Sequence, residues 1–255
     1  MISSKYLSDI LEEIAPLQLS KAFIEKGAYD NSGLLVKTHE GATSILLALD
    51  LTEEVVKKAV KIGADTIITH HPAIYTPLKE LGEETKALLL AIKKNLNIYS
   101  LHLNLDIADK GIDQSLAEGL GGKKFKILEY VTETNGYGRE FEVEKVRLEN
   151  FVKKAKIEFN SKKIIYYGKK TKEIKLVASF CGAGGSSATN YQGDADLIVS
   201  SDLPHHVILK MVEEGKAVMV IPHYVAEFYG FKKFYEQLSK IKEVKITLFD
   251  DKRYR

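Results

Sequence analysis

The chain has 255 residues, of which 45% are hydrophobic, and its 37 Lys and Arg nearly balance its 35 Asp and Glu. A formal net charge of +2 gives no strong signature of nucleic-acid or membrane binding, although lysine pairs can still form local patches. The single cysteine excludes an internal disulfide, and no apolar run approaches the ~20 residues that span a bilayer. Acidic residues at positions 9, 12 and 13 also argue against a signal peptide, so we expect a cytoplasmic protein.

Strand-like and helix-like stretches alternate along the first half of the chain, which indicates an α/β fold. Apolar spacing predicts, in order, a helix over 4–14, a strand over 43–51, a helix over 53–62, a strand over 65–69, a helix over 83–94, a strand over 97–104 and a helix over 112–120. Thr52 is expected to cap the second of these helices, and Gly121-Gly122 to close the last.

The middle of the chain changes character. Residues 126–143 alternate roughly between apolar and polar around Asn135-Gly136, which predicts a hairpin. The pattern then predicts a helix over 148–159, strands over 163–167 and 175–181, a Gly-rich turn over 181–187, and a strand–helix rhythm from 196 to the end. We therefore expect two α/β lobes, 1–122 and 123–255, with the segment 217–255 able to return to the first lobe.

Histidines are the most informative residues of this sequence. Six of the seven fall in four clusters at or just past predicted strands, namely His70-His71, His102, His205-His206 and His223. Asp106 and Glu227 lie close to two of these clusters in the sequence. Neutral nitrogen donors with neighbouring carboxylates are what a transition-metal site needs. The sequence therefore predicts a metal centre, which the returning segment 217–255 can complete.

The His70-His71 pair directly precedes Pro72. Successive side chains of a regular strand point to opposite faces, so the strand itself could not direct both imidazoles to one ion. Because Pro72 ends the regular ladder, the chain can turn there, and each histidine can serve one of two neighbouring metals. The alternative is a strand end with one buried and one exposed histidine.

Residues 102–106 are interpreted as the continuation of a strand. On a strand His102, Asn104 and Asp106 share one face, which is unusual where helices flank the sheet. This pattern favours Asp106 as a carboxylate ligand, with His102 and Asn104 bound to the metal or close behind the ligands. The alternative is an exposed edge strand.

His223 and Glu227 stand four residues apart after Pro222. If Pro222 is the first helical residue, both side chains project from one face of the opening turn and can bind the same or adjacent ions. The alternative is a surface pair. His205-His206 is predicted to open another helix, where the two imidazoles are either solvated or in contact with substrate at the rim of the site.

The Gly-rich segment 181–187 follows a strand and could cradle a phosphate on backbone N–H groups. It matches neither Gly-x-Gly-x-x-Gly nor a P-loop, because Ser187 holds the last place and no lysine follows. The pattern therefore favours a tight turn.

Taken in order, these motifs resemble the Ngg1-interacting factor 3-like family, whose members are also labelled GTP cyclohydrolase 1 type 2 homologues. The matching segments cover nearly the whole chain and are Asp30-Asn31-Ser32-Gly33-Leu34, Ile68-Thr69-His70-His71-Pro72, His102-Leu103-Asn104-Leu105-Asp106, 181–187, Ser201-Asp202-Leu203-Pro204-His205-His206 and His223-Tyr224-Val225-Ala226-Glu227. No single segment is specific, but the ordered set is.

The resemblance implies a two-lobed α/β fold with mixed sheets flanked by helices, assembled as a ring-shaped homohexamer. It also implies two divalent transition-metal ions per chain, of Zn, Fe, Mn or Ni, on residues matching His70, His71, Asp106, His223 and Glu227. Two departures could alter the pocket: Tyr29 lies in a turn where the family often has Trp, and Leu103 replaces a Thr.

A two-metal centre favours a metal-dependent hydrolase that acts on a nucleotide or phosphoester, with His102 or His206 assisting proton transfer. Substrate contacts or support of the ligands are expected from Asp30, Asn31, Asn104 and His205. The alternative is a non-catalytic ring that binds metal and a partner, either DNA or a regulatory protein, and a third hypothesis is metal delivery. None of these hypotheses involves a membrane.

Overall fold

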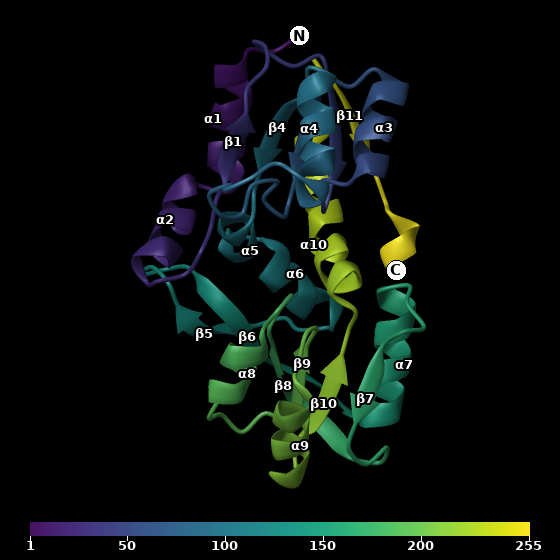
Figure 1. Ribbon diagram of the computed structural model, residues 1–255. Helices are drawn as coiled ribbons and strands as arrows, with labels where there is room; N and C mark the ends of the chain where they lie inside the picture. Colours follow the sequence, from purple (N-terminus) through teal and green to yellow (C-terminus); the bar gives the residue numbers. More distant parts are fainter. The chain divides into compact units, whose positions relative to one another are not determined.

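The computed structural model describes all residues from Met1 to Arg255 (Figure 1). Contacts divide the chain into two compact units: the first contains 1–109 and 231–251, and the second contains 110–230 and 252–255. One division falls inside helix α10 (His223–Leu238), so one helix supplies residues to both units. The expected α/β fold with mixed sheets flanked by helices is confirmed.

The first unit is built on a five-stranded sheet in the order β1-β4-β3-β2-β11. Its strands are β1 (Gly33–Val36), β2 (Ser44–Ala48), β3 (Thr66–Thr69), β4 (Asn97–Ser100) and β11 (Lys245–Leu248). Only β1 runs antiparallel to its neighbour. The three central strands β2, β3 and β4 are wholly buried, as expected of parallel strands covered on both faces.

The helices of the first unit cover this sheet (Figure 1). They are α1 (Ser4–Ile14), α2 (Leu17–Glu25), α3 (Glu53–Ile62), α4 (Lys86–Lys93) and α5 (Leu103–Ile107), with a short 3-10 turn η1 (Glu83–Thr85) before α4. The predicted cap of α3 is confirmed, because the Thr52 hydroxyl accepts a hydrogen bond from the Val55 N–H. Apolar residues of α3 and α4 share a core with β2, β3 and β4.

The prediction that residues 102–106 continue a strand is wrong. Strand β4 ends at Ser100, the chain turns at His102, and the His102 carbonyl accepts the N–H groups of Leu105 and Asp106. The turn begins α5, which buries its apolar side chains Leu105 and Ile107. Because the segment is helical, His102, Asn104 and Asp106 do not form the one-sided polar row of a strand.

The second unit is built on a six-stranded sheet in the order β5-β6-β8-β9-β10-β7. Its strands are β5 (Phe125–Tyr130), β6 (Gly136–Arg147), β7 (Ile165–Tyr167), β8 (Glu173–Ser179), β9 (Leu197–Ser200) and β10 (Ala217–Val220). The predicted hairpin is confirmed, because β5 and β6 pair antiparallel. Strands β8, β9 and β10 are parallel, and β7 pairs antiparallel to β10.

Four further helices belong wholly to the second unit. They are α6 (Ile112–Gly119), α7 (Leu148–Glu158), α8 (Gly185–Asn190) and α9 (His205–Glu213). Helix α6 packs with β6 and β8, which is why its contacts place it in this unit. A last 3-10 turn, η2 (Lys252–Tyr254), ends the chain. None of the helices in either unit combines the length and the apolar character that crossing a bilayer requires.

Candidate metal centre

In the first unit, the histidines and their partners gather where parallel strands end. Asp50 follows β2, His70 and His71 follow β3, and His102 follows β4. The carboxyl ends of parallel strands meet at one edge of a sheet, where open α/β folds usually bind their ligands. The candidate ligand atoms of His70, His71 and His102 accordingly lie within 4.8 Å of one another. We call these residues the three-histidine cluster.

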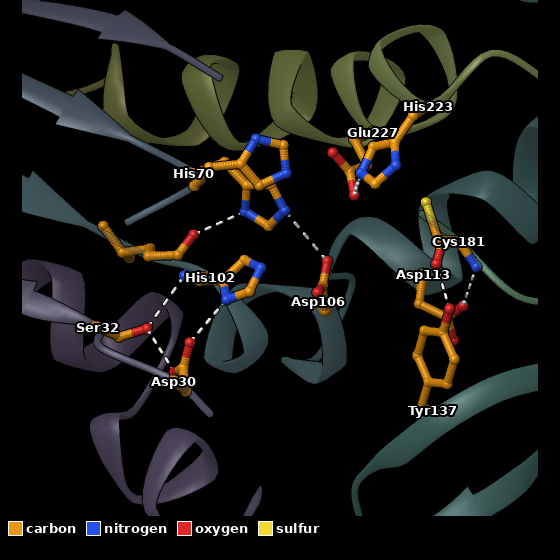
Figure 2. Close-up of polar contacts among 12 residues, drawn as sticks. Asp30, Ser32, His70, His102, Asp106, Asp113, Tyr137, Cys181, His223 and Glu227 are labelled. Carbon is orange, nitrogen blue, oxygen red and sulfur yellow. Dashed lines mark hydrogen bonds and ion pairs between the residues drawn. The ribbon is translucent and has the colours of Figure 1, made fainter. Parts of the chain in front are cut away.

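His70 is fully buried, and both of its ring nitrogens face polar groups. Its Nδ1 donates to the Leu101 carbonyl at 2.7 Å, so the proton of the neutral ring lies on Nδ1 and the Nε2 lone pair remains a ligand. Figure 2 shows this imidazole facing Asp106, whose Oδ1 is 3.5 Å from Nε2. Two atoms each bound at about 2.1 Å to one tetrahedral ion lie roughly 3.4 Å apart, so this separation fits a shared ion.

The other two imidazoles of the three-histidine cluster are each held by a carboxylate. Nδ1 of His71 is 2.7 Å from Oδ1 of Asp50. Nδ1 of His102 is 2.7 Å from Oδ1 of Asp30, and the His102 backbone N–H donates to Ser32 (Figure 2). Burial raises the pKa of Asp30, but hydrogen bonds from His102 and from two serines outweigh it, so the pKa lies below its ordinary value. Asp30 therefore stays ionised and keeps the proton of His102 on Nδ1.

In the second unit, His223 and Glu227 form a pair on the first turn of α10. The helix begins at His223, one residue later than predicted, and the Pro222 carbonyl accepts the Ala226 N–H. The predicted shared face is present, because Nε2 of His223 is 2.7 Å from Oε1 of the buried Glu227. This is a hydrogen-bond distance, which an ion between the two side chains would have to widen. The other nitrogen, Nδ1, is 2.6 Å from Oδ2 of Asp202.

The Gly-rich turn after β8 supports this His–Glu pair. Gly182 adopts a left-handed φ of +63°, and a Cβ at this position would lie 2.5 Å from Oε1 of Glu227. Only glycine therefore lets the backbone come so close to the carboxylate. The backbone of Cys181 is fixed on both sides, since its N–H donates to Asp113 at 3.2 Å and its carbonyl accepts the Tyr137 hydroxyl (Figure 2).

Asp113 belongs to a buried ion pair behind the turn. Its Oδ2 is 2.9 Å from Nη1 of Arg139, and both side chains are buried. The same guanidinium nitrogen also donates to the carbonyls of Gly136 and Gly138. Burial raises the pKa of Asp113 to about 6, although the Arg139 guanidinium acts in the opposite direction. The charge of this aspartate is therefore sensitive to pH near neutrality.

The remaining predicted site residues either hydrogen-bond to the backbone or are exposed to solvent. The Asn31 amide donates to the Ile74 carbonyl at 2.6 Å, and the buried Asn104 amide donates to the Ala15 carbonyl at 2.7 Å. Both asparagines therefore hold backbone segments of the first unit together. His205 and His206 are exposed in the first turn of α9.

Sequence reasoning named Asp30, which orients His102, but missed the other groups that orient the imidazoles. Asp50 and Asp202 each lie two residues after the end of a parallel strand, so the rule that site residues cluster at strand ends could have singled them out. The Leu101 carbonyl has no sequence signal, because every residue carries one. No sequence pattern indicates the Asp113–Arg139 ion pair either, because the two residues lie on different elements of the second unit.

Comparison with known proteins finds similar sequences over nearly the whole chain. The sequence model of Duf34/NIF3 (NGG1p interacting factor 3) matches residues 2–253. A GTP cyclohydrolase 1 type 2 homolog of Clostridium perfringens is 33% identical over 244 residues, covering 91% of this chain and 89% of that protein. One of the same description from Methanocaldococcus jannaschii is 32% identical over 254 residues, covering 98% and 100%.

Solved structures share the fold of this chain. Reduced HcgD from Methanocaldococcus jannaschii superposes with a TM-score of 0.82 at 29% identity, covering 98% of each chain. The hypothetical protein SA1388 of Staphylococcus aureus gives a TM-score of 0.81 at 25% identity, covering 95% of this chain and 94% of that one. Both likenesses extend over both units of the chain.

Proposed function

Because the chain belongs to the Duf34/NIF3 family, we propose that it holds two divalent metal ions on His70, His71, Asp106, His223 and Glu227. One repeated observation carries this proposal. Nδ1 of each of the three histidines faces a carbonyl or carboxylate oxygen at 2.6–2.7 Å, which leaves Nε2 as the metal-binding atom. Metal-bound histidines are oriented in this way by acceptors behind them.

The donor set also fits two cations. Asp106 and Glu227 are buried, and burying a carboxylate is costly unless a cation or strong hydrogen bonds compensate it. Three imidazoles and two carboxylates suit Zn, Fe, Mn or Ni. Five ligands do not complete two coordination shells unless carboxylates bridge and solvent fills the open positions. Open positions are typical of catalytic rather than structural sites.

The reaction we propose is hydrolysis of a nucleotide or another phosphoester. Two bound divalent ions would supply activation of water and neutralisation of charge on the phosphoryl oxygens. His102 is placed to carry a proton, because Asp30 fixes its Nδ1 proton and leaves Nε2 as a base. His206 is the second candidate for proton transfer, and His205 is proposed to contact the substrate.

A metal-loaded panel assay tests the reaction. The protein is loaded with Zn, Mn, Fe or Ni, occupancy is measured, and phosphoesters and nucleotides including GTP are offered. We expect turnover with at least one metal, and a loss of about 100-fold or more in His102→Ala at unchanged metal content. His39→Ala is the matched control, since His39 bonds with Thr38 and Asn97 outside the cluster. Full occupancy without any turnover would contradict the hydrolase proposal.

The alternative is a ring-shaped metal-binding scaffold for DNA or a regulatory protein, and the description of the family as an interacting factor favours it. Binding of single- and double-stranded DNA across a salt series tests the first partner, because phosphate contacts make the affinity fall steeply with salt. A negligible slope argues against DNA. Assembly into a homohexamer is part of both proposals, and sedimentation of the metal-loaded protein tests it.

A further inference from the structure

Two exposed tyrosines stand beside the three-histidine cluster in the first unit. Tyr29 lies in the turn before β1, and Tyr75 lies in the loop after β3. Tyr29 is 64% exposed and Tyr75 is 49% exposed, although burying a large aromatic ring is energetically favourable. The ring centroids are 6.3 Å apart at an interplanar angle of 40°. The two rings therefore form one aromatic surface that stays open to solvent in this chain.

Hydrogen bonds hold the two tyrosines in place. The Tyr75 hydroxyl donates to the Tyr29 carbonyl at 3.1 Å, and the Asn31 amide donates to the Ile74 carbonyl at 2.6 Å. The turn and the loop are thus tied together at two adjacent points. Because the surface is already ordered, a ligand that binds to it does not have to supply the free energy of ordering these side chains, and this preorganisation favours binding.

The aromatic surface is joined to the metal-binding residues. The Tyr75 ring packs edge-on against the His102 ring, with centroids 5.9 Å apart at 81°. Asp30, which follows Tyr29 directly, orients His102 through Nδ1 at 2.7 Å. The turn that positions His102 therefore also carries one of the two tyrosines, and the ring of the other contacts the cluster.

We propose that Tyr29 and Tyr75 form a stacking platform for the flat ring of a nucleotide whose phosphate end reaches the three-histidine cluster. The inference rests on the proposed function and names the substrate class of the same site. Hydrolysis of a phosphoester requires only the metal-binding groups. Two exposed rings beside those groups would add affinity only for a ligand with a planar part that can stack on them. Every nucleobase has a face that can stack on an aromatic ring, so the platform suits nucleotides in general.

A docking protein is the competing explanation for the exposed rings. Leu78 and Leu81 on the same loop are also exposed and could join a protein interface. The edge contact between Tyr75 and His102 favours the nucleotide, because a protein covering these rings would also cover the cluster. The experiment below includes both explanations.

The test compares AMP with ribose 5-phosphate, which carries the same sugar phosphate without the base. Binding to Zn-loaded wild type, Tyr29→Leu, Tyr75→Leu and Tyr75→Phe is measured by calorimetry, with zinc content and sedimentation recorded for each sample. Tyr6→Leu is the matched control, since Tyr6 is 47% exposed on α1 of the same unit. Tyr75→Phe keeps the ring and loses only the hydroxyl.

We expect wild type to bind AMP at least about ten-fold more tightly than ribose 5-phosphate, and each leucine variant to lose about ten-fold in AMP affinity. Zinc content and ribose 5-phosphate affinity should not change, and Tyr6→Leu should keep the AMP affinity. Tyr75→Phe should lose less AMP affinity than Tyr75→Leu, because it keeps the ring and loses only the hydrogen bond to Tyr29. Equal affinities for the two ligands in zinc-loaded wild type would overturn the platform and leave the metal centre standing. Leucine variants that change sedimentation but not AMP affinity would overturn it in favour of a protein interface. Wild type that takes up no zinc would instead contradict the metal centre itself.

Discussion

Four imidazoles of this protein share one local arrangement. His71, His102 and His223 each place Nδ1 against an aspartate, and His70 places Nδ1 against a backbone carbonyl. The acceptor fixes the rotation of each ring. The Nε2 lone pairs are therefore already oriented before a metal binds, and the aspartates matter although they are not among the proposed ligands.

Removing one such aspartate should weaken metal binding without removing a ligand. We expect Asp50→Ala to lower zinc affinity about 10–100-fold, because His71 loses the acceptor that orients it. Competition with a chromophoric chelator measures the affinity. Asp9→Ala is the control, since Asp9 only pairs with Lys5 on the surface of α1. An unchanged affinity in Asp50→Ala would show that the hydrogen bond is irrelevant to the site.

The Asp113–Arg139 pair predicts a pH dependence of stability. The pKa of Asp113 is raised to about 6 in the folded protein, above its ordinary value of 3.8. The stability that this group contributes is therefore fully present below pH ~4 and is lost as pH rises through ~6. Arg139 limits that loss, because its positive charge favours the ionised carboxylate.

Arg139→Met should consequently destabilise the protein far more at high pH than at low pH. We expect a loss of about 3–5 kcal/mol in the free energy of unfolding at pH 8, where the buried carboxylate has no cation beside it. The loss should be clearly smaller at pH 5, where Asp113 can take up a proton. Urea denaturation at both pH values checks this, with the exposed Arg147→Met as control. Equal losses at the two pH values would contradict the explanation.

At the scale of elements, both units place polar residues just after the ends of parallel strands. Parallel strands β2, β3 and β4 end just before Asp50, His70 and His102, while β8, β9 and β10 end just before the Cys181 turn, Asp202 and His223. The carboxyl edge of a parallel sheet gathers side chains from distant parts of the sequence. Each sheet therefore contributes its own group of polar residues.

The turn after β8 gives a prediction with a closely matched control. Gly182 and Gly215 both have φ near the left-handed region, at +63° and +82°, so alanine should cost about 1–2 kcal/mol of strain at either position. Only at Gly182 would the new Cβ strike Glu227, while nothing lies within 4 Å at Gly215. Thermal unfolding should thus shift to lower temperature in both variants, further in Gly182→Ala because of the added clash, and only Gly182→Ala should lose metal affinity. Similar metal affinities in the two variants would contradict the role assigned to the turn.

Most elements could be predicted from the sequence, and α5 shows why some could not. Helix α1 and the β5–β6 hairpin follow from apolar spacing, because each is long enough to show its period. Alternating leucines at 101, 103 and 105 imitate a strand, whereas the segment forms a five-residue helix. So short a helix shows no period, and its buried contacts within the first unit decide its conformation.

The candidate site shows the same limit. Histidines at strand ends can be recognised as candidates in the sequence, because residue type and strand position are both visible there. Asp30 can be recognised as a candidate too, but which acceptor faces which imidazole cannot, since Asp50 is 21 positions from His71, Asp30 is 72 from His102 and Asp202 is 21 from His223. The fold alone brings these pairs together, and it is the pairs that give each imidazole its direction.

At the scale of the whole molecule, the proposed ligands are spread over the entire chain. His70, His71 and Asp106 belong to the first unit, and His223 and Glu227 belong to the second. The helix that carries His223 and Glu227 continues into the first unit. The proposed ligand set includes residues of both units, so the proposal predicts that a ligand removed from either unit lowers the metal content.

Metal analysis of the purified protein beside His71→Ala and Glu227→Ala tests the central claim most directly, because each variant removes one proposed ligand from a different unit. We predict two divalent ions per chain in wild type and a clear fall in both variants. Circular dichroism should show that the variants keep their fold, and His39→Ala should keep both ions. Unchanged metal content in His71→Ala and Glu227→Ala, or wild type that holds no ion after loading, would contradict the proposed centre.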